Sequence, residues 1–539
     1  MEYLYSWTVA LFLTIALIPL LIRLSVQLGL VDDPSAERKV HSVLMPRTGG
    51  LGIIIGAALP LLFLLPMEGY LLYLFVGCAI IVIFGLFDDR LELSYKWKLF
   101  GQSLAAIVVM SGGIVAYKLP FLGLENAPLW LSYPITFFFL VGVVNGVNFS
   151  DGLDGLAAGT SVMALLLIFL LALHAENTNV ALISLTVVGG VLGFLRYNTF
   201  PANIFMGDAG SQFLGFVIAC LAILVTQKGI APYSAFLPIL ILGIPIMDIL
   251  QVVPVRIKKN LPLPGPDKEH FHHQIAKLGF RHTDVVALVY VLQAILLSGA
   301  FLLRYHSDLA VATFYVTYVV LILGLLLLAN FTGWHFRGKD REAQFESRRA
   351  WVKRRLAWYA ANCPRLIALL VSAFFVLSGW YLSPGGNSFS LALVMCVSCA
   401  TCWLLAKSTV SRQIFRVVLY LASVAIAYFL LFPANLGLVE TSSLLAFAVL
   451  MVAFLTLGIY LTGQQDFRLT TQDLLILLVV LLLPLLPIEV VDRYALGRVV
   501  LLVALLMYAS EFVLLRTTRM VAICVGCALA SVAVVLGLP

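Results

Sequence analysis

Runs of about 20 apolar residues recur along this whole sequence, and they restrict its fold more than any other feature. A helix of that length crosses the hydrocarbon core of a bilayer with its backbone polar groups satisfied. The composition agrees, because 62% of the 539 residues are hydrophobic and only 11% are charged, against about 25% in soluble domains. The sequence therefore predicts an all-α, polytopic integral membrane protein.

The apolar runs predict about 18 transmembrane helices, which divide into two sets. The first set, of about eleven, is expected near residues 4–24, 50–66, 70–87, 98–117, 129–148, 155–174, 179–195, 209–226, 233–253, 284–304 and 309–331. The second set, of about seven, is expected near residues 365–382, 388–406, 414–432, 441–462, 472–488, 497–515 and 520–538.

Basic residues in alternate loops predict the orientation. Loops 25–49, 88–98 and 254–283 each carry several Lys or Arg residues, whereas the loops between them carry at most one. By the positive-inside rule the basic loops face the cytoplasm, so the N-terminus faces outward. Glu2 and the lack of a basic N-terminal region favour a first span over a cleaved signal peptide. The net charge of +7 is an ordinary inner-loop excess and does not indicate nucleic-acid binding.

Segment 332–363 is rich in Arg and Lys, with Trp and Tyr interleaved. Two interpretations stay open, an amphipathic helix on an anionic inner leaflet and an ordinary basic linker. In either case the segment divides a membrane domain at 1–331 from a C-terminal transmembrane region at 364–539, whose role the sequence does not indicate.

Polar residues gather where several spans of the first domain end. Asp88 and Asp89 end the third span, and the stretch 145–159, NGVNFSDGLDGLAAG, joins the fifth span to the sixth. Asp208 begins the eighth span, and three histidines follow the ninth at 270, 272 and 273. Ionisable groups at membrane helix ends are expensive and indicate function. All four segments are expected on the cytoplasmic side.

Carboxylates in this arrangement suit phosphate chemistry with Mg²⁺. A hard cation takes two or three carboxylates and completes its shell with substrate phosphate oxygens. Asp88 and Asp89 repel one another, so a cation beside them is expected. The helix starts after Asp154 and Asp208 offer backbone N–H groups to phosphate.

Each motif alone has an ordinary alternative. The Asp88–Asp89 pair resembles a solvated loop start, and the DGLDG segment could be a turn with capping aspartates. The histidines could form a zinc site, but no Cys or carboxylate set at zinc spacing accompanies them. Only the combination argues for a shared site.

In combination, the motifs resemble the polyprenyl-phosphate N-acetylhexosamine-1-phosphate transferase family. The resemblance covers about residues 1 to 330 and includes ERKVHSVLMPRTGG at 37–50, the Asp pair, the 145–159 stretch, NTFPANIFMGDAGS at 198–211 and the HxHH set. The RKxH and HxHH forms resemble the WecA-like branch, whereas the related phospho-MurNAc-pentapeptide transferases more typically have three consecutive histidines. Such enzymes have ten or eleven membrane helices.

The resemblance implies a role for each motif residue. Asp208 resembles the principal Mg²⁺ ligand, with Asp151 beside it, and Mn²⁺ is a candidate substitute. Asp88, Asp89, Asp151 and the histidines His270, His272 and His273 resemble residues that act at the metal, the lipid phosphate or the diphosphate. The candidate substrate-binding residues are Asn145, Asn148, Gly152, Leu153, Asp154, Phe205, Lys39, His41 and Lys98, with Phe205 stacking on the uracil.

The implied reaction joins a UDP-N-acetylhexosamine to undecaprenyl phosphate and releases UMP on the cytoplasmic face of the bacterial inner membrane. Such a product would begin a lipid-linked glycan. Direct attack by the lipid phosphate is favoured, because a phosphate monoester has a second pKa of about 6 and is already mostly a dianion that needs no base. A covalent aspartate intermediate stays open. A homodimer and downstream glycan-assembly enzymes are further candidate partners.

Two other functions are consistent with parts of this pattern. A transporter or flippase of lipid-linked sugars would suit about 18 helices, but it would place charges near mid-span rather than at helix ends. A degenerate scaffold is disfavoured because every charged motif position is filled. No residue indicates which UDP-N-acetylhexosamine is used.

Overall fold

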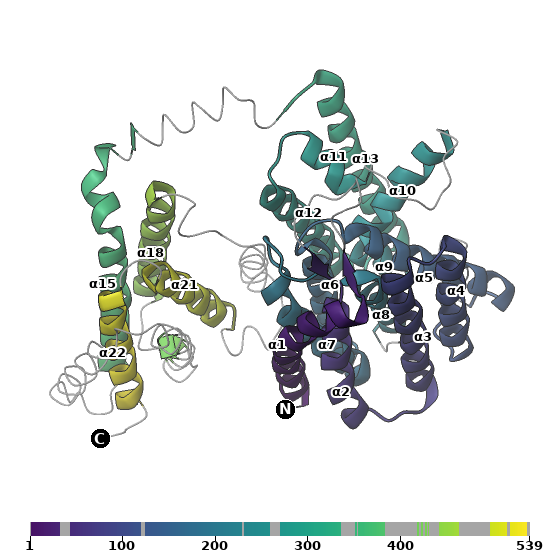
Figure 1. Ribbon diagram of the computed structural model, residues 1–539, viewed down its shortest axis with the longest axis horizontal. Coiled ribbons are helices and arrows are strands. Elements are labelled where there is room, and N and C mark those ends of the chain that lie inside the picture. The colour runs from purple at the N-terminus through teal and green to yellow at the C-terminus, as the bar shows by residue number, and fades with distance from the viewer. Residues whose placement is uncertain are drawn as a thin grey trace. The chain divides into compact units, whose positions relative to one another are not determined.

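The computed structural model consists of helices with one short pair of strands (Figure 1). It describes residues 2–32, 44–119, 124, 126–228, 231–258, 270–335, 351–352, 354–382, 441–462, 496–514 and 518–535, together with isolated positions between 415 and 430.

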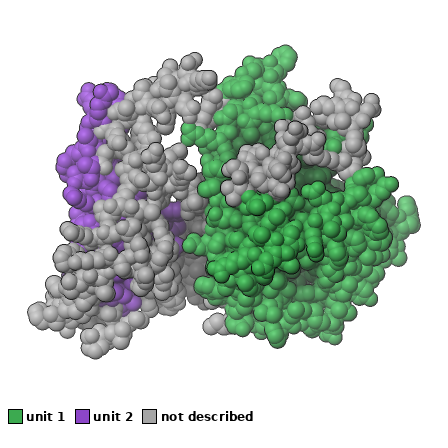
Figure 2. Space-filling model, viewed as in Figure 1, with its two compact units in different colours: residues 1–337, 470–475 green, residues 338–469, 476–539 purple. Residues whose placement is uncertain are grey.

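The chain divides into two compact units (Figure 2). Unit 1 comprises residues 1–337 with 470–475, and unit 2 comprises residues 338–469 with 476–539. The basic segment expected at 332–363 falls at this division. Its residues 336–350 and 353 lie outside the described part, so neither interpretation of it is tested.

Every span expected before residue 332 corresponds to helix. The helices of unit 1 are α1 (Glu2–Leu28), α2 (Gly49–Leu64), α3 (Gly69–Leu91), α4 (Tyr95–Ser111), α5 (Leu129–Ser150), α6 (Leu156–His174), α7 (Thr178–Asn198), α8 (Gly207–Gln227), α9 (Leu237–Ile241), α10 (Gly243–Lys258), α11 (Phe271–Lys277), α12 (His282–Leu302) and α13 (Asp308–Thr332). The expected ninth span is two helices, because the chain breaks at Leu242 between α9 and α10.

Helix α8 is the centre of unit 1. Its apolar stretch is fully buried, and the helix packs against α2, α3, α5 and α6. Glycines allow the closest approaches. A Cβ added at Gly85 of α3 would lie 2.5 Å from the Cα of Ala209, and one added at Gly50 of α2 would lie 2.4 Å from the Cα of Gly210. The beginning of α8 is therefore held against the ends of two other helices.

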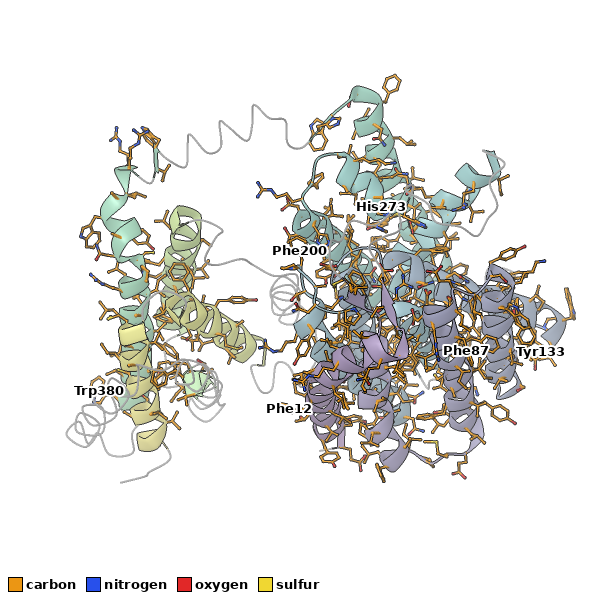
Figure 3. The ribbon with its side chains drawn as sticks, viewed as in Figure 1. Phe12, Phe87, Tyr133, Phe200, His273 and Trp380 are labelled. Atoms are coloured by element: carbon orange, nitrogen blue, oxygen red, sulfur yellow. The ribbon has the colours of Figure 1, made fainter. Side chains whose placement is uncertain are left out.

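The outer helix faces of unit 1 expose apolar side chains. Phe12 and Phe87 are 62% and 53% exposed, and Figure 3 draws them on the outer helices α1 and α3. Within the described residues, nine helices are long and apolar enough to cross a membrane. Apolar outer faces and apolar cores together are what a bilayer requires. The protein is a multi-pass membrane protein.

Two short strands lie next to the helix ends of unit 1. Strand β1 (Val31–Asp32) pairs in antiparallel fashion with β2 (Met45–Pro46), and Pro46 O accepts a hydrogen bond from Phe205 N. This pair ties the segment before α2 to the segment before α8.

Unit 2 is described in part, as helices α15 (Ala357–Leu382), α18 (Thr441–Thr462), α21 (Leu496–Leu514) and α22 (Thr518–Val535). These correspond to four expected spans. Their buried side chains form an apolar cluster that includes a stack between Phe374 and Phe447, with ring centroids 4.9 Å apart. The spans expected at 388–406 and 472–488, and most of 414–432, lie outside the described residues.

Candidate active site

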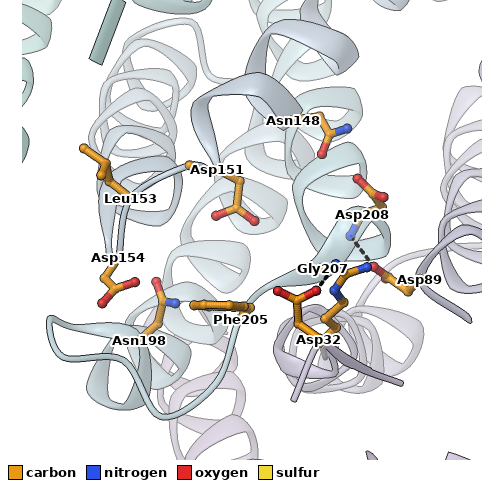
Figure 4. A pocket seen from close by; sticks show the side chains of 12 residues that line it. Asp32, Asp89, Asn148, Asp151, Leu153, Asp154, Asn198, Phe205, Gly207 and Asp208 are labelled. Carbon is orange, nitrogen blue, oxygen red and sulfur yellow. Dashed lines mark hydrogen bonds and ion pairs between the residues drawn. The ribbon is translucent and has the colours of Figure 1, made fainter. Parts of the chain in front are cut away.

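A polar cavity of about 380 Å³ lies where α5, α7 and α8 approach the strand pair (Figure 4). Figure 4 shows Asn148, Asp151 and Asp208 along one side of it, and Asn198 and Phe205 along the other. The full lining is Asp32, Arg47, Asp89, Asn148, Asp151, Gly152, Leu153, Asp154, Asn198, Phe205, Gly207 and Asp208.

Asp89 holds the beginning of α8. Its Oδ1 accepts from Asp208 N at 2.7 Å and its Oδ2 accepts from Ala209 N at 3.0 Å. The first N–H groups of a helix have no partner within the helix, and a carboxylate there also stabilises the helix dipole. Gly207 has a φ of +76°, which lets the chain turn into α8 at this point. Asp89 therefore fixes where the carboxylate of Asp208 is presented.

Asp88 has a different partner from its neighbour. Lys98 Nζ lies 2.5 Å from Asp88 Oδ2 and 3.4 Å from Asp208 Oδ2, so one ammonium joins the ends of α3 and α8. Asp88 also accepts from Leu93 N at 3.0 Å beyond the end of α3. Lys98 is about one-third exposed, at 32% of its side chain. This ammonium is thus a cation beside the cavity that a phosphate could reach.

The two asparagines of the 145–159 stretch contact the neighbouring helices differently. Asn148 Oδ1 accepts from Ser211 Oγ at 2.6 Å, which fixes its amide beside Asp208. Asn145 exchanges hydrogen bonds with Gln102, whose Nε2 also donates to Gln212 at 3.1 Å. Asn145 does not line the cavity, so it supports the packing of α4, α5 and α8.

The DGLDG loop is bound to the loop before α8. Asp154 Oδ2 accepts from Ala202 N at 3.0 Å, and Asn198 Oδ1 accepts from Gly155 N at 2.9 Å. Asn198 also donates to Ile204 O at 2.8 Å. Asp154 is 8% exposed, and these bonds use its carboxylate to join two segments about 50 residues apart in sequence. Asp154 and Asn198 build the wall on which Phe205 is placed.

Asp151 brings a second carboxylate to the cavity, on the same side as that of Asp208. Burial raises the pKa of Asp151 to about 7, and the negative charges of Asp208 and Asp154 contribute. A carboxyl group with a pKa near neutrality is held partly protonated by its neighbours, and a bound cation would release that proton.

These residues suit a divalent cation that shares its coordination with a substrate. Among the described residues, no group of three or more His, Cys, Asp or Glu side chains could hold a metal ion alone. Mg²⁺, however, is commonly bound through one or two carboxylates plus substrate phosphates. Asp151 and Asp208 could supply the carboxylates, and Asn148 an amide oxygen, since all three line the cavity.

The three histidines lie at α11, outside the cavity lining. His270 Nδ1 lies 2.8 Å from Asp248 Oδ2 of α10, and the rings of His272 and His273 are 4.2 Å apart. Burial lowers the pKa of His272 to about 3, followed by the charge of His273 as the next largest cause. His272 is thus a neutral imidazole. A Cβ added at Gly152 would lie 2.5 Å from its Nε2, so His272 packs closely against a residue of the cavity lining.

The structure brings together most of the residues that the sequence selected. Asp89, Asn148, Asp151, Gly152, Leu153, Asp154, Phe205 and Asp208 line the cavity, whereas Asp88, Lys98, Asn145, His270, His272 and His273 lie around it. Lys39 and His41 lie outside the described residues. The roles assigned to individual residues stay predictions.

Sequence reasoning gave no role to several residues that shape the site. Arg47 and Asp32 form an ion pair across the β1–β2 strands and line the cavity. Asn198 and Arg47 lie inside the quoted motifs, but the sequence does not indicate which residues they bind. Asp248 had a usable signal, because a lone carboxylate in an apolar run is itself a reason to expect a function. Asp32 had no such signal in its loop.

Comparison with known proteins places the chain in a family. A family model described as glycosyl transferase family 4 matches residues 71–226. A probable undecaprenyl-phosphate N-acetylglucosaminyl 1-phosphate transferase of Bacillus subtilis is 37% identical over 331 residues, which are 61% of this chain and 91% of that protein. The chain belongs to glycosyl transferase family 4.

More distant members of the family give the same picture. The undecaprenyl-phosphate alpha-N-acetylglucosaminyl 1-phosphate transferase of Escherichia coli K12 is 28% identical over 355 residues, covering 64% of this chain and 93% of that protein. The protein of the same name from Yersinia pestis is 28% identical over 285 residues, covering 51% and 77%. Each of these matches covers most of the relative and leaves more than a third of this chain unmatched.

Proposed function

We propose that this protein transfers N-acetylhexosamine 1-phosphate from a UDP-N-acetylhexosamine to undecaprenyl phosphate and releases UMP. The observation that carries the proposal is the cavity in which Asp151, Asp208 and Asn148 face Phe205, with the cation Lys98 at its edge. The relatives named above act on undecaprenyl phosphate and an N-acetylglucosaminyl 1-phosphate group, which supports this substrate pair.

The donor would lie along the cavity wall. Phe205 offers an aromatic face for the uracil ring, and Gly152 and Leu153 leave room beside it. The diphosphate would then reach Asp151 and Asp208, where Arg47 adds a positive charge to the lining. N-acetylglucosamine is the sugar favoured by the relatives' names, and no side chain in the lining selects a particular hexosamine.

Asp151 and Asp208, with Asn148, would hold Mg²⁺, or Mn²⁺ in its place. When bound, the cation neutralises charge on the diphosphate and makes it a better electrophile. Asp89 keeps Asp208 in place through the start of α8, and Lys98 places an ammonium where negative charge would otherwise repel the acceptor.

In the reaction, an oxygen of the lipid phosphate attacks the phosphorus that carries the sugar. The bond from that phosphorus to the bridging oxygen breaks, and UMP leaves with the bridging oxygen and its electron pair. Positioning and charge neutralisation account for most of the catalysis of phosphoryl transfer. Lys98 and Arg47 are the cations placed for this neutralisation among the described residues at the cavity and its edge.

An apolar cavity on the same helices could take part of the lipid chain. It has a volume of about 290 Å³ and lies between α2, α3, α7 and α8. Ile83 and Phe213, which line it, are each five residues from Asp88 and Asp208, or about 8 Å along a helix. A polyprenyl chain in this cavity would place its phosphate near the carboxylates. The active site would face the cytoplasm and the protein would reside in the bacterial inner membrane, following the charge of the loops.

The test is UMP release by the purified protein in detergent. Wild-type protein is supplied with undecaprenyl phosphate, Mg²⁺ and a panel of UDP-N-acetylhexosamines, and both UMP and the lipid diphosphate sugar are measured. We expect stoichiometric formation of the two products with at least one donor. UMP release without lipid product would indicate hydrolysis, and no release with any donor would contradict the proposal.

A further inference from the structure

Asp248 of α10 is a buried carboxylate that neither lines the cavity nor belongs to the predicted site. It is 2% exposed, and α10 lies close against α5, since a Cβ added at Gly146 would be 3.0 Å from Ile249 and from Pro245 O. Burying a charge at such a position is costly unless it is paired and hydrogen-bonded. The hydrogen-bond partners of Asp248 therefore indicate its role.

Both oxygens of Asp248 bind the first turn of the histidine helix. Oδ2 lies 2.8 Å from His270 Nδ1, and Oδ1 accepts from Phe271 N at 2.7 Å. An ionised carboxylate only accepts hydrogen bonds, so the proton of a neutral His270 must be on Nδ1. One side chain thus fixes the tautomer of His270, the orientation of its ring and the start of α11.

The oriented histidines contact the loop that forms the cavity wall. The His270 ring lies 4.9 Å from that of Phe149 at the end of α5, and 6.1 Å from the parallel ring of His272. His272 Nε2 is buried against Gly152, with no hydrogen-bond partner among the described residues. Gly152 follows Asp151 in the lining. A shift of His270 would therefore reach the residues that face the donor.

We propose that Asp248 is a positioning residue that acts through His270, holding the histidine helix against loop 151–155 so that the donor wall has one conformation. The proposal rests on the proposed function only for its kinetic consequence. Its structural part concerns this chain alone. Carboxylates that orient a metal-ligating histidine typically change metal affinity or activity by about 10- to 100-fold when removed, and we expect an effect at the lower end of that range here.

The first measurement needs no substrate. Asp248→Asn can still accept from Phe271 N, but its amide N–H faces His270 and forces the opposite tautomer. Hydrogen–deuterium exchange of peptides covering 151–155 should be faster in Asp248→Asn and in His270→Ala than in wild type. The double variant should exchange no faster than His270→Ala, because coupled residues are not additive. Unchanged exchange in Asp248→Asn, or additive increases, would overturn the proposal.

The second measurement separates positioning from stability. Asp248→Asn should raise the KM for the UDP-sugar about tenfold and leave the KM for undecaprenyl phosphate unchanged. A merely destabilised protein loses maximal rate without a change in either KM. Gln293→Leu is the matched control, since it removes a buried hydrogen bond from α12 to Ile241 O, and Gln293 makes no hydrogen bond to a histidine among the described residues. It should lower thermal stability with both KM values unchanged.

The two proposals fail in different ways. A wild-type protein that releases no UMP contradicts the proposed function, whereas the exchange experiment still decides the role of Asp248. An active wild type whose donor KM is the same in Asp248→Asn contradicts the positioning role and leaves the transferase function intact.

Discussion

Both compact units pack apolar helices, but their buried polar side chains are of different kinds. Unit 1 buries carboxylates, amides and imidazoles, including Asp88, Asp89, Gln212 and His272. The described part of unit 2 buries only serines among polar side chains, and they are Ser372, Ser378, Ser423, Ser510 and Ser531.

This difference distinguishes helices that only pack together from helices that also position charged groups for a reaction. A serine hydroxyl can satisfy itself on its own helix, as Ser423 does by donating to Leu419 O. A carboxylate cannot, because it has no proton to give to a carbonyl and its charge is costly away from water. In unit 1 each buried aspartate is therefore bound to another segment, and those bonds converge around one cavity. The described helices of unit 2 show a membrane scaffold without such a site.

The largest effect should come from Asp208, whose carboxylate is the centre of that convergence. Asp208→Ala should reduce UMP release by about 10²–10³-fold at saturating Mg²⁺, the usual cost of losing one preorganised group that stabilises transition-state charge. The matched control is Ser372→Ala, a buried polar side chain in unit 2, which should stay within about twofold of wild type. Substantial activity in Asp208→Ala would contradict the assignment of Asp208 as a metal ligand.

The next effect tests whether the histidine helix must touch the wall. Gly152→Ala would place a Cβ 2.5 Å from His272 Nε2, so the loop or the histidine must move. A displacement near 1 Å can cost about 10²-fold in rate, so we expect a loss of about 10- to 100-fold. Gly142→Ala in α5 meets nothing within 4 Å and serves as the control. Equal activity of the two variants would contradict the contact.

A smaller effect concerns protons and the cation. Burial and negative neighbours raise the pKa of Asp151 to about 7, so protons compete with a cation for this carboxylate below that pH. Mn²⁺ affinity, followed by electron paramagnetic resonance without lipid, should weaken about tenfold from pH 8 to pH 6, as expected for one competing proton on a group with a pKa of about 7. Asp151→Asn lacks the titrating group, so it should bind more weakly with little change over this range. A pH-independent affinity of the wild type would argue against Asp151 as a ligand.

The sequence located the helices and most of the cavity, and the reason lies in what each pattern encodes. A 20-residue apolar run is a local property, so the spans before residue 332 could be placed without knowing their neighbours. Asp151 and Asp208 stood out because they belong to several polar motifs that gather at the ends of apolar runs. Which carboxylate binds which partner is a property of three-dimensional packing. Asp88 and Asp89 are adjacent in sequence, yet one binds Lys98 and the other the start of α8.

Local patterns also fail where the chain is irregular. The expected ninth span is divided at Leu242, and the division gives α10 its own start close against α5. An apolar run cannot show such a break. For the same reason, the sequence could select the three histidines but not the bond between His270 and Asp248, which are 22 residues apart.

The smallest effect on activity should come from disturbing unit 2. A Cβ added at Gly379 of α15 would lie 2.8 Å from the Cβ of Ser531 in α22, so Gly379→Leu must separate these two helices. Overpacking of this kind typically costs about 1–3 kcal/mol. We expect a lower midpoint for thermal unfolding, with kcat and both KM values within about twofold of wild type. A changed KM for undecaprenyl phosphate in Gly379→Leu would contradict this difference between the units, because unit 2 would then contribute to acceptor binding. A change confined to thermal stability instead limits the described helices of unit 2 to a role outside the transfer step.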